Sequence, residues 1–161
     1  EPGLPLAGPT DRASYVARLD ETPVNPTHRA HARRLIAEID AGRPIQAKYP
    51  YPIHAFAVGD SLTLVALAGE VVVDYSLRLK REAAAPGRSL WVAAYADDVF
   101  SYVPSARVLA EGGYEGGEAI FGSYANLPGP FAPEVETTIV ETVRDLIAKV
   151  APTSPVRESS K

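Results

Sequence analysis

One carboxylate and two tyrosines stand where a protein can build a site for a metal ion and a substrate carbonyl. Glu70 follows an almost wholly apolar run, residues 62–68, and comes directly after Gly69. This pattern places Glu70 at the carboxyl end of a strand, where ligand sites of α/β sheets gather. Tyr102 and Tyr114 flank a short helical stretch downstream. Together the three residues resemble the second half of a metal site, with a hydrogen-bond donor for a carbonyl oxygen.

Each of these residues also has a structural interpretation. Glu70 can cap the helix expected after it, or it can pair with Arg78 or Arg81 on that helix. An isolated tyrosine is usually a packing residue whose hydroxyl group is hydrogen-bonded. Tyr102 and Tyr114 therefore gain a functional interpretation only from the sequence around them.

Two histidines, His28 and His31, lie three positions apart on a predicted helix and can share one face of it. Zinc-binding pairs on helices are more often four apart with a glutamate between them, and this segment has no such acid. Arg29, Arg33 and Arg34 share the surface, and their positive charge opposes a bound cation. We therefore do not expect His28 and His31 to bind a metal.

Three further polar residues belong to the predicted strands or follow them. His54 lies in the strand expected at 53–58, as a half-buried residue or one that faces a substrate. Asp97 and Asp98 follow the strand expected at 89–96. Because neighbouring residues of an extended chain point to opposite faces, the two carboxylates cannot act as an acid–base pair on one substrate atom. One of them can still orient a metal ligand.

The composition is that of an ordinary globular chain, and it excludes several classes of function. Of the 161 residues, 46% are hydrophobic and 22% are charged, which is typical of one domain with a hydrophobic core. The net charge is -4 and the Lys and Arg residues are scattered, so no nucleic-acid partner is expected. The absence of cysteine excludes disulfides and thiolate ligands. No apolar run approaches the ~20 residues of a transmembrane segment.

Hydrophobic periodicity predicts a mixed α/β (α+β) fold in which helices cover a sheet. Strands are expected at residues 53–58, 61–67 and 89–96, with a tight turn after the first. Helices are expected at residues 10–19, 26–41, 71–82, 104–110 and 133–150. Thr10 and Asn25 are the predicted N-caps of the first two helices, and Gly42 is the αL residue after the second. The chain is expected to form one domain (1–161), with a linker at 1–9 and a tail at 151–161.

The segment from about residue 45 to residue 150 resembles the neutral/alkaline non-lysosomal ceramidase family, in the C-terminal portion of its catalytic domain. In that family a strand ends in a Pro-Gly-Glu or Gly-Glu signature, matched here by Gly69-Glu70. A later strand leads into an Asn-x-x-x-x-Tyr-[Ile/Val] segment, matched by residues 97–103. A Tyr-Glu-Gly/Ala segment, a Gly-containing loop and a long helix follow, and Tyr114-Glu115-Gly116 matches the first of these. The matched elements occur in the correct order and spacing.

The resemblance implies a zinc-dependent amidohydrolase that cleaves the N-acyl bond of ceramide or a related lipid amide into a fatty acid and a sphingoid base. Carried over position by position, Glu70 and Tyr102 would ligate zinc (Zn2+), and Tyr114 would hydrogen-bond the scissile amide. In the family, two histidines complete the zinc site, and a serine and an arginine act beside it. All four lie in upstream segments that this chain does not contain. The implied partner is therefore the upstream half of the catalytic domain, and this partial domain is expected to be inactive alone.

The chain departs from the family pattern at three places. Asp97 stands where the family has Asn, Pro104-Ser105 replaces a Thr-Thr pair, and residues 127–131 replace a Gly-Pro-His-Thr stretch of the eukaryotic enzymes. These changes bear on the substrate more than on the metal, and they indicate a bacterial ceramidase-like protein. The apolar loop 127–131 can line a lipid-chain channel or cover the core. The family also implies a secreted or periplasmic location.

A non-catalytic function is the alternative. In that interpretation the chain is a ceramidase-derived module for binding or assembly that has kept the fold and lost the metal. Retention of Glu70, Tyr102 and Tyr114 together favours the enzyme, because a site without function tends to lose polar groups that are costly to keep.

Overall fold

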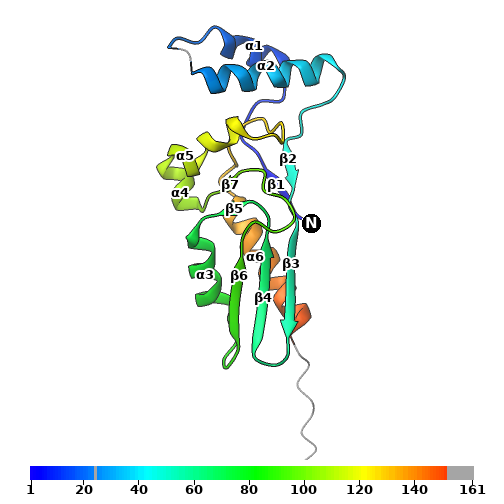
Figure 1. Ribbon diagram of the computed structural model, residues 1–161, viewed down its shortest axis with the longest axis vertical. Helices are drawn as coiled ribbons and strands as arrows, with labels where there is room; N and C mark the ends of the chain where they lie inside the picture. The colour runs from blue at the N-terminus through cyan, green and yellow to red at the C-terminus, as the bar shows by residue number, and fades with distance from the viewer. Residues whose placement is uncertain (24, 152–161) are drawn as a thin grey trace, which may run out of the picture.

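The computed structural model describes residues 1–23 and 25–151 of the chain. Its architecture is α+β, as predicted from the sequence: within the described residues, six α-helices and one 3-10 helix accompany seven short strands. The tail predicted at 151–161 lies outside the described residues except for its first residue. The molecule is elongated, with a helical hairpin at one end and a sheet covered by helices at the other (Figure 1). None of the described helices has the length and apolar character needed to cross a membrane.

The main sheet has three strands, in the order β3–β4–β6. Strands β3 (Ile53–Val58) and β4 (Leu62–Leu67) form an antiparallel hairpin, and β6 (Ser89–Ala93) joins β4 in parallel. The predicted hairpin is therefore confirmed, and Gly59 in its turn has a φ of 57°, which glycine adopts readily. The third strand is shorter than the expected 89–96, because the chain turns away after residue 93.

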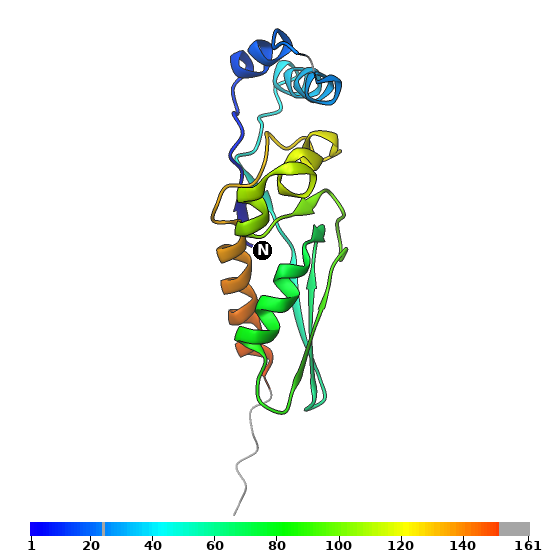
Figure 2. The same cartoon turned by 90° about the vertical axis from the view of Figure 1, so that its left-hand side faces the viewer.

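Two amphipathic helices cover one face of this sheet. Helix α6 (Val135–Val150) packs against β3, and α3 (Val73–Ala83) packs against β6 and α6. The alternation of β4 points Val65 and Leu67 to that side, where both are fully buried with Ile139 and Val143 of α6. Figure 2 shows both helices on the same side of the sheet. The hydrophobic core therefore lies between this face and the helices.

Two small strand pairs lie above the main sheet. Strand β1 (Gly3–Pro5) pairs antiparallel with β2 (Lys48–Pro50), and β5 (Glu70–Val71) pairs parallel with β7 (Tyr102–Val103). Within the linker predicted at residues 1–9, residues 3–5 thus form a strand. The helix predicted at 71–82 begins later, at Val73, since the residues before it pair with β7.

The segment between β7 and α6 forms three short helices in succession. They are α4 (Ala106–Glu111), α5 (Gly113–Gly116) and the 3-10 helix η1 (Glu118–Gly122). Ser105 caps α4 by accepting a hydrogen bond from the Val108 amide at 3.2 Å. The helix expected at 104–110 therefore starts two residues later, after Pro104 and Ser105.

Helices α1 (Arg12–Leu19) and α2 (Pro26–Asp40) form the hairpin at the end of the molecule (Figure 1). The Asn25 side chain accepts hydrogen bonds from two amides of the first turn of α2, as predicted for an N-cap. Gly42 has a φ of 75° and ends the helix, as predicted. The prediction of Thr10 as a cap is wrong: Asp11 accepts from the Ser14 amide at 2.9 Å instead.

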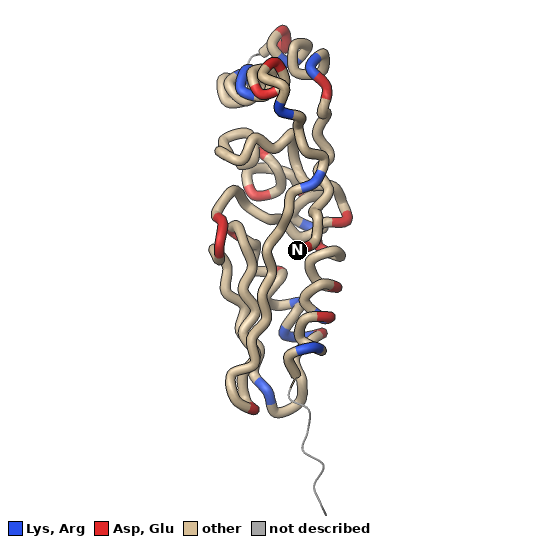
Figure 3. Tube along the Cα trace, turned by 90° about the vertical axis from the view of Figure 1, so that its right-hand side faces the viewer, with Lys and Arg blue, Asp and Glu red and all other residues tan. Residues whose placement is uncertain are grey.

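Charged residues are mixed over the surface. Lys and Arg lie on helices and linkers among Asp and Glu, and they form no single patch in the view of Figure 3.

His31 anchors the helical hairpin to the rest of the fold. Its Nε2 atom lies 2.7 Å from the carbonyl oxygen of Leu127, and the ring is fully buried beside Phe121. Burial lowers the pKa of His31 to about 4, because the protonated ring would lose its hydration. Nearby Arg34 and Arg18 oppose the charge in the same direction. His31 therefore holds a neutral ring in a structural position.

We predict that acid destabilises the fold through His31. The ring titrates near ~6.5 in the unfolded chain, so the unfolded state binds the proton more readily than the folded state. The stabilisation is complete above pH ~6.5 and declines as the pH falls towards 4. Urea unfolding should therefore show a loss of about 2 kcal/mol from this residue between pH 7 and pH 5. His31→Gln should flatten that dependence, whereas His54→Gln, at a largely exposed ring, should not.

Candidate functional site

A tight turn at Gly69 brings the end of β4 against the loop that follows β6. The Gly69 amide donates to the Asp98 carbonyl at 2.6 Å, and the Glu70 amide donates to the Ser101 carbonyl at 2.9 Å. Gly69 has a φ of 68°, and a Cβ atom there would lie 2.8 Å from the Ser101 oxygen. Only glycine meets both requirements without displacing the loop. Gly69 thus determines where Glu70 lies.

Glu70 and Tyr102 are direct partners across the β5–β7 pair. Opposite residues in a sheet project their side chains to the same side, so the carboxylate and the phenol lie next to each other. The sequence suggested that Glu70 ends strand β4. In the structure β4 ends at Leu67, and Glu70 starts a strand of its own after the Gly69 turn. The two residues interpreted as metal ligands are brought together nonetheless.

Tyr114 reaches the same place from helix α5. Its ring centroid lies 5.5 Å from that of Tyr102, in an edge-to-face arrangement. Helix α5 packs closely on α4 because Gly116 lacks a side chain: a Cβ atom there would lie 2.6 Å from the Val108 oxygen. Tyr114 itself is 66% exposed, so its hydroxyl group is accessible from outside the chain.

The three residues line one open hollow of about 330 Å³. The rest of its wall comes from two segments, the loop before β7 and the stretch around η1. These contribute Val99, Phe100, Ser101, Ala119, Gly122, Ser123 and Tyr124. The hollow therefore combines one carboxylate and three phenols with apolar walls, which suits an amphipathic ligand.

Glu70 controls the protonation of two tyrosines. Hydrogen bonding to its carboxylate raises the pKa of Tyr95 to about 12, and it raises the pKa of Tyr102 above the usual value. Burial and the negative charge of Glu70 act in the same direction. Both phenols are protonated at neutral pH, as tyrosine ordinarily is, and the raised pKa makes loss of the proton less favourable still.

Sequence reasoning missed Tyr95. Its backbone is in the left-handed region, with a φ of 59°, and this conformation turns the residue back towards Glu70. The Tyr95 amide also donates to the Gly69 carbonyl at 2.9 Å. Tyr95 lay inside the strand predicted at 89–96, and the left-handed turn has no glycine to mark it.

The segments around the hollow supply only carboxylates as charged side chains, although two residues of α2 reach them: Arg34 donates to the Ser123 carbonyl at 2.7 Å, and His28 lies 2.7 Å from Glu118. Residues 69–71, 95–102 and 114–124 contain Glu70, Asp97, Asp98, Glu115 and Glu118, and no Lys or Arg. A group of carboxylates at an open hollow creates a potential that attracts cations. The surroundings of Glu70 thus favour a metal ion or another positive group.

The side chains of Asp97 and Asp98 interact with different partners, as predicted, although the two residues lie in a loop and not in a strand. Asp97 pairs with His54, whose Nε2 lies 2.8 Å from the carboxylate. Asp98 accepts hydrogen bonds from Tyr49 and Tyr124. Because Tyr124 lines the hollow, Asp98 orients one of its walls and does not face the ligand position itself.

Glu70 and Tyr102 make up at most half of a zinc site. Zinc in catalytic sites has at least three protein ligands, and nowhere in residues 1–23 and 25–151 do three His, Cys, Asp or Glu side chains gather around a metal position. His28 lies 2.7 Å from Glu118 and packs on Phe121, so it is engaged elsewhere. The donor types fit zinc, but the number of donors does not.

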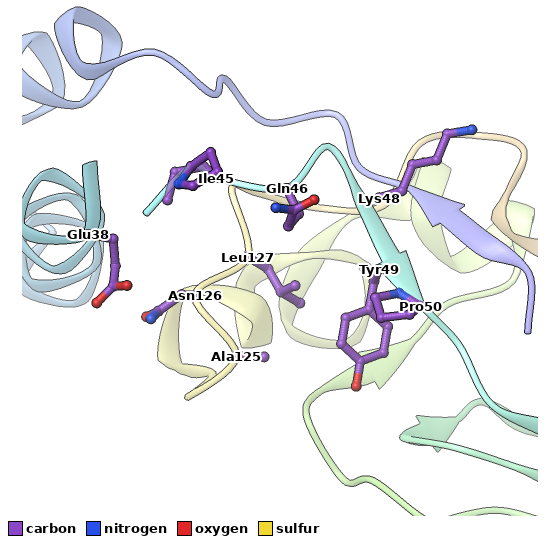
Figure 4. Close-up of a pocket in the computed structure, with 10 residues that line it drawn as sticks. Glu38, Ile45, Gln46, Lys48, Tyr49, Pro50, Ala125, Asn126 and Leu127 are labelled. Atoms are coloured by element: carbon purple, nitrogen blue, oxygen red, sulfur yellow. The ribbon is translucent and has the colours of Figure 1, made fainter. Parts of the chain in front are cut away.

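A second hollow, of about 230 Å³, lies between α2 and β2 (Figure 4). Asn126 and Glu38 lie at one side of it and Tyr49 at the other. The Tyr49 ring packs 4.0 Å from the ring of Phe100, which separates this hollow from the candidate site. Leu127 lines it and is almost fully buried, so this part of the 127–131 loop covers the core.

Comparisons with protein-family models, with curated proteins and with solved structures find no match to this chain. The functional interpretation therefore depends on the residues of the site and on their geometry.

Proposed function

We propose that this chain is the part of a zinc-dependent amidohydrolase, resembling neutral ceramidase, that supplies a carboxylate ligand, a phenolate ligand and an oxyanion donor. The observation that carries the proposal is the convergence of Glu70, Tyr102 and Tyr114 on one hollow. Glu70 and Tyr102 are paired residues of two strands, and Tyr114 arrives from a helix twelve positions after Tyr102. Three separate segments thus bring together the three residue types that the resemblance implies.

The residues of this chain have distinct tasks in that reaction. Zinc held at this site would supply a bound water of pKa near ~7 and would polarise the amide carbonyl. Glu70 and Tyr102 would hold it, and Tyr102 would give its hydroxyl proton to solvent on binding, against the raised pKa that Glu70 gives the free phenol. Tyr114 would donate to the oxygen that becomes negative as the amide is attacked. A donor of this kind is typically worth about 3–4 kcal/mol.

The substrate we propose is the N-acyl amide of a sphingoid base or a related lipid amide, released as a fatty acid and an amine. Val99, Phe100 and Ala119 give the hollow apolar walls beside its polar residues, an arrangement that suits a lipid chain next to an amide. The remaining zinc ligands would come from the upstream half of the catalytic domain. A secreted or periplasmic location belongs to the same proposal.

The hydrogen bonds within the site favour one alternative function. The Glu70 carboxylate raises the pKa of Tyr95 and of Tyr102, so the three groups interact without a metal. The same residues would therefore also be retained in a non-catalytic binding or assembly module that has lost zinc.

The 161-residue chain by itself is expected to be inactive. It provides two of the three or more protein ligands that catalytic zinc needs. Release of fatty acid from a fluorescent ceramide, measured with added zinc, should equal the no-protein control. Adding the polypeptide encoded upstream in the same reading frame should restore both zinc binding and hydrolysis. Turnover by the chain alone would contradict the proposal, and a zinc-free, inactive mixture would favour the non-catalytic module.

A further inference from the structure

One face of the main sheet is left uncovered by the described residues. Helices α3 and α6 pack on the opposite face, and Figure 2 shows no element on this side of β3, β4 and β6. The alternation of the strands determines which residues this face presents: His54, Phe56 and Val58 from β3, Leu62, Leu64 and Ala66 from β4, and Ser89, Trp91 and Ala93 from β6. Seven of these nine residues are apolar.

The centre of this sheet face is a continuous apolar row. Phe56, Leu64 and Trp91 are paired in register across the three strands. Phe56 is 50% exposed, Trp91 is 62% exposed, and neighbouring Val58 is 52% exposed. Large apolar side chains that lie together in water are a recognised sign of an interaction surface, because their burial is favourable.

The strands of this face also carry no charge. Residues 53–58, 62–67 and 89–93 contain no Asp, Glu, Lys or Arg, and they are tan in Figure 3. Among the described residues, β3 and β6 each pair only with β4, so each has one edge without a strand partner. Natural sheets protect exposed edges and faces with charged residues or cover them with another element. This sheet has no such charges, which indicates that another element covers it.

The sheet face is continuous with the candidate site. His54 stacks on Phe56 at one end of the face, with ring centroids 6.0 Å apart, and pairs with Asp97 of the acidic loop. Tyr95 follows two residues after β6, and its amide donates to the carbonyl of Gly69, directly before Glu70, at 2.9 Å. A layer laid over the face would therefore reach the hollow that holds Glu70 and Tyr102.

We propose that this sheet face is the docking surface for the polypeptide layer that completes the candidate site. The layer places apolar side chains over the row of Phe56, Leu64 and Trp91, and it carries histidine or basic residues at the end that meets the acidic segments. This inference extends the proposed function, because the docked layer is the part that supplies the missing zinc ligands.

Charge decides between this occupant and a second copy of the chain. The segments around the hollow hold five carboxylates and no Lys or Arg; His28 and His54 pair with two of the carboxylates, and Arg34 of α2 donates to the Ser123 carbonyl. A second copy would bring the same acidic segments, so it would supply no positive charge to complement the carboxylates at the end of the sheet face near the hollow. A layer with histidine or basic residues there is complementary in charge, and its apolar part matches the rest of the face.

Trp91 reports on docking directly, because it is the single tryptophan of this chain. The experiment mixes the 161-residue chain with the polypeptide encoded immediately upstream in the same reading frame, produced separately with its tryptophans replaced by phenylalanine. We expect a stable complex, a blue shift of the Trp91 emission and at least a 5-fold drop in its quenching by acrylamide.

Two charge substitutions test the location of the contact. Phe56→Asp puts a carboxylate in the middle of the covered face, and it should weaken association by about 10²-fold or more, since a buried unpaired charge is costly. Leu77→Asp is the matched control, because Leu77 is 59% exposed on α3, away from this face. It should leave association unchanged. Both side chains are half exposed or more, so circular dichroism should show an intact fold for each variant.

Several results would overturn the docking proposal. They are a complex in which Trp91 stays open to acrylamide, equal effects of the two substitutions, self-association of the chain in place of a complex, or the absence of any upstream polypeptide in the reading frame. The zinc content of the complex, measured separately, keeps the two proposals distinct. A docked complex without zinc would refute the zinc enzyme and leave the docking surface standing. Zinc bound in a complex in which Trp91 stays exposed would refute the docking surface and leave the zinc enzyme standing.

Discussion

Replacement of Glu70 by alanine is expected to remove zinc and abolish amide hydrolysis in the protein formed with the upstream half. Glu70 and its strand partner Tyr102 are the two proposed ligands among the described residues. Loss of one carboxylate from a site of four protein ligands lowers affinity severely, because no neighbouring group replaces it. Elemental analysis should find less than a tenth of the zinc of the unmodified protein.

The control for this substitution is Glu115→Ala. Glu115 is exposed and adds to the negative field at Tyr102, but it is not paired with a strand partner in the site. Its loss should leave zinc occupancy near the original level. Glu70→Ala should also keep the circular dichroism spectrum, because Glu70 lies outside the hydrophobic core. Full zinc occupancy in Glu70→Ala would show that the carboxylate serves only as hydrogen-bond acceptor for Tyr95 and Tyr102.

Replacement of Tyr114 by phenylalanine should lower kcat by about 10²–10³, with bound zinc retained and KM little changed. The hydroxyl group of Tyr114 would interact with the substrate oxygen chiefly in the transition state, so its loss affects the chemical step more than binding. Tyr102→Phe is expected to behave differently. It removes a ligand and should lower the zinc content itself.

Tyr124→Phe is a matched control for these two tyrosine variants. Tyr124 lines the same hollow and is 66% exposed, as Tyr114 is, but its hydroxyl group is bound to Asp98. Its removal should change kcat by less than about 10-fold, since no oxyanion donor is lost. If Tyr114→Phe lost its metal or kept full activity, the oxyanion role would be wrong. Full activity would make Tyr114 a packing residue beside Tyr102.

The larger elements of the fold could be predicted because their signals are local. The β3–β4 hairpin follows from alternating apolar residues around Gly59, and helix α2 from the Asn25 cap and Gly42. Helix α6 follows from its apolar stripe. These elements are long enough for the period of the pattern to distinguish helix from strand.

The candidate site was predicted as a set of residues but not as a structure. Strands β5 and β7 have two residues each, too few for any periodicity, and they exist because Gly69 brings distant segments together. The left-handed conformations of Tyr95 and Asp97 have no sequence signal, so the contact between Tyr95 and Glu70 was missed. The uncovered sheet face was also hidden, because an alternating strand pattern does not reveal whether its second face is covered.

A crystal structure of the protein formed with the upstream half, with anomalous diffraction recorded at the zinc edge, tests the central claim most directly. The account predicts one zinc ion within about 2.0–2.2 Å of a Glu70 carboxylate oxygen. The Tyr102 oxygen should lie in the same coordination sphere, and the Tyr114 hydroxyl group should face the open position without touching the metal. Zinc bound elsewhere, or a Glu70 carboxylate still held by Tyr95 and Tyr102 with no metal beside it, would contradict the account.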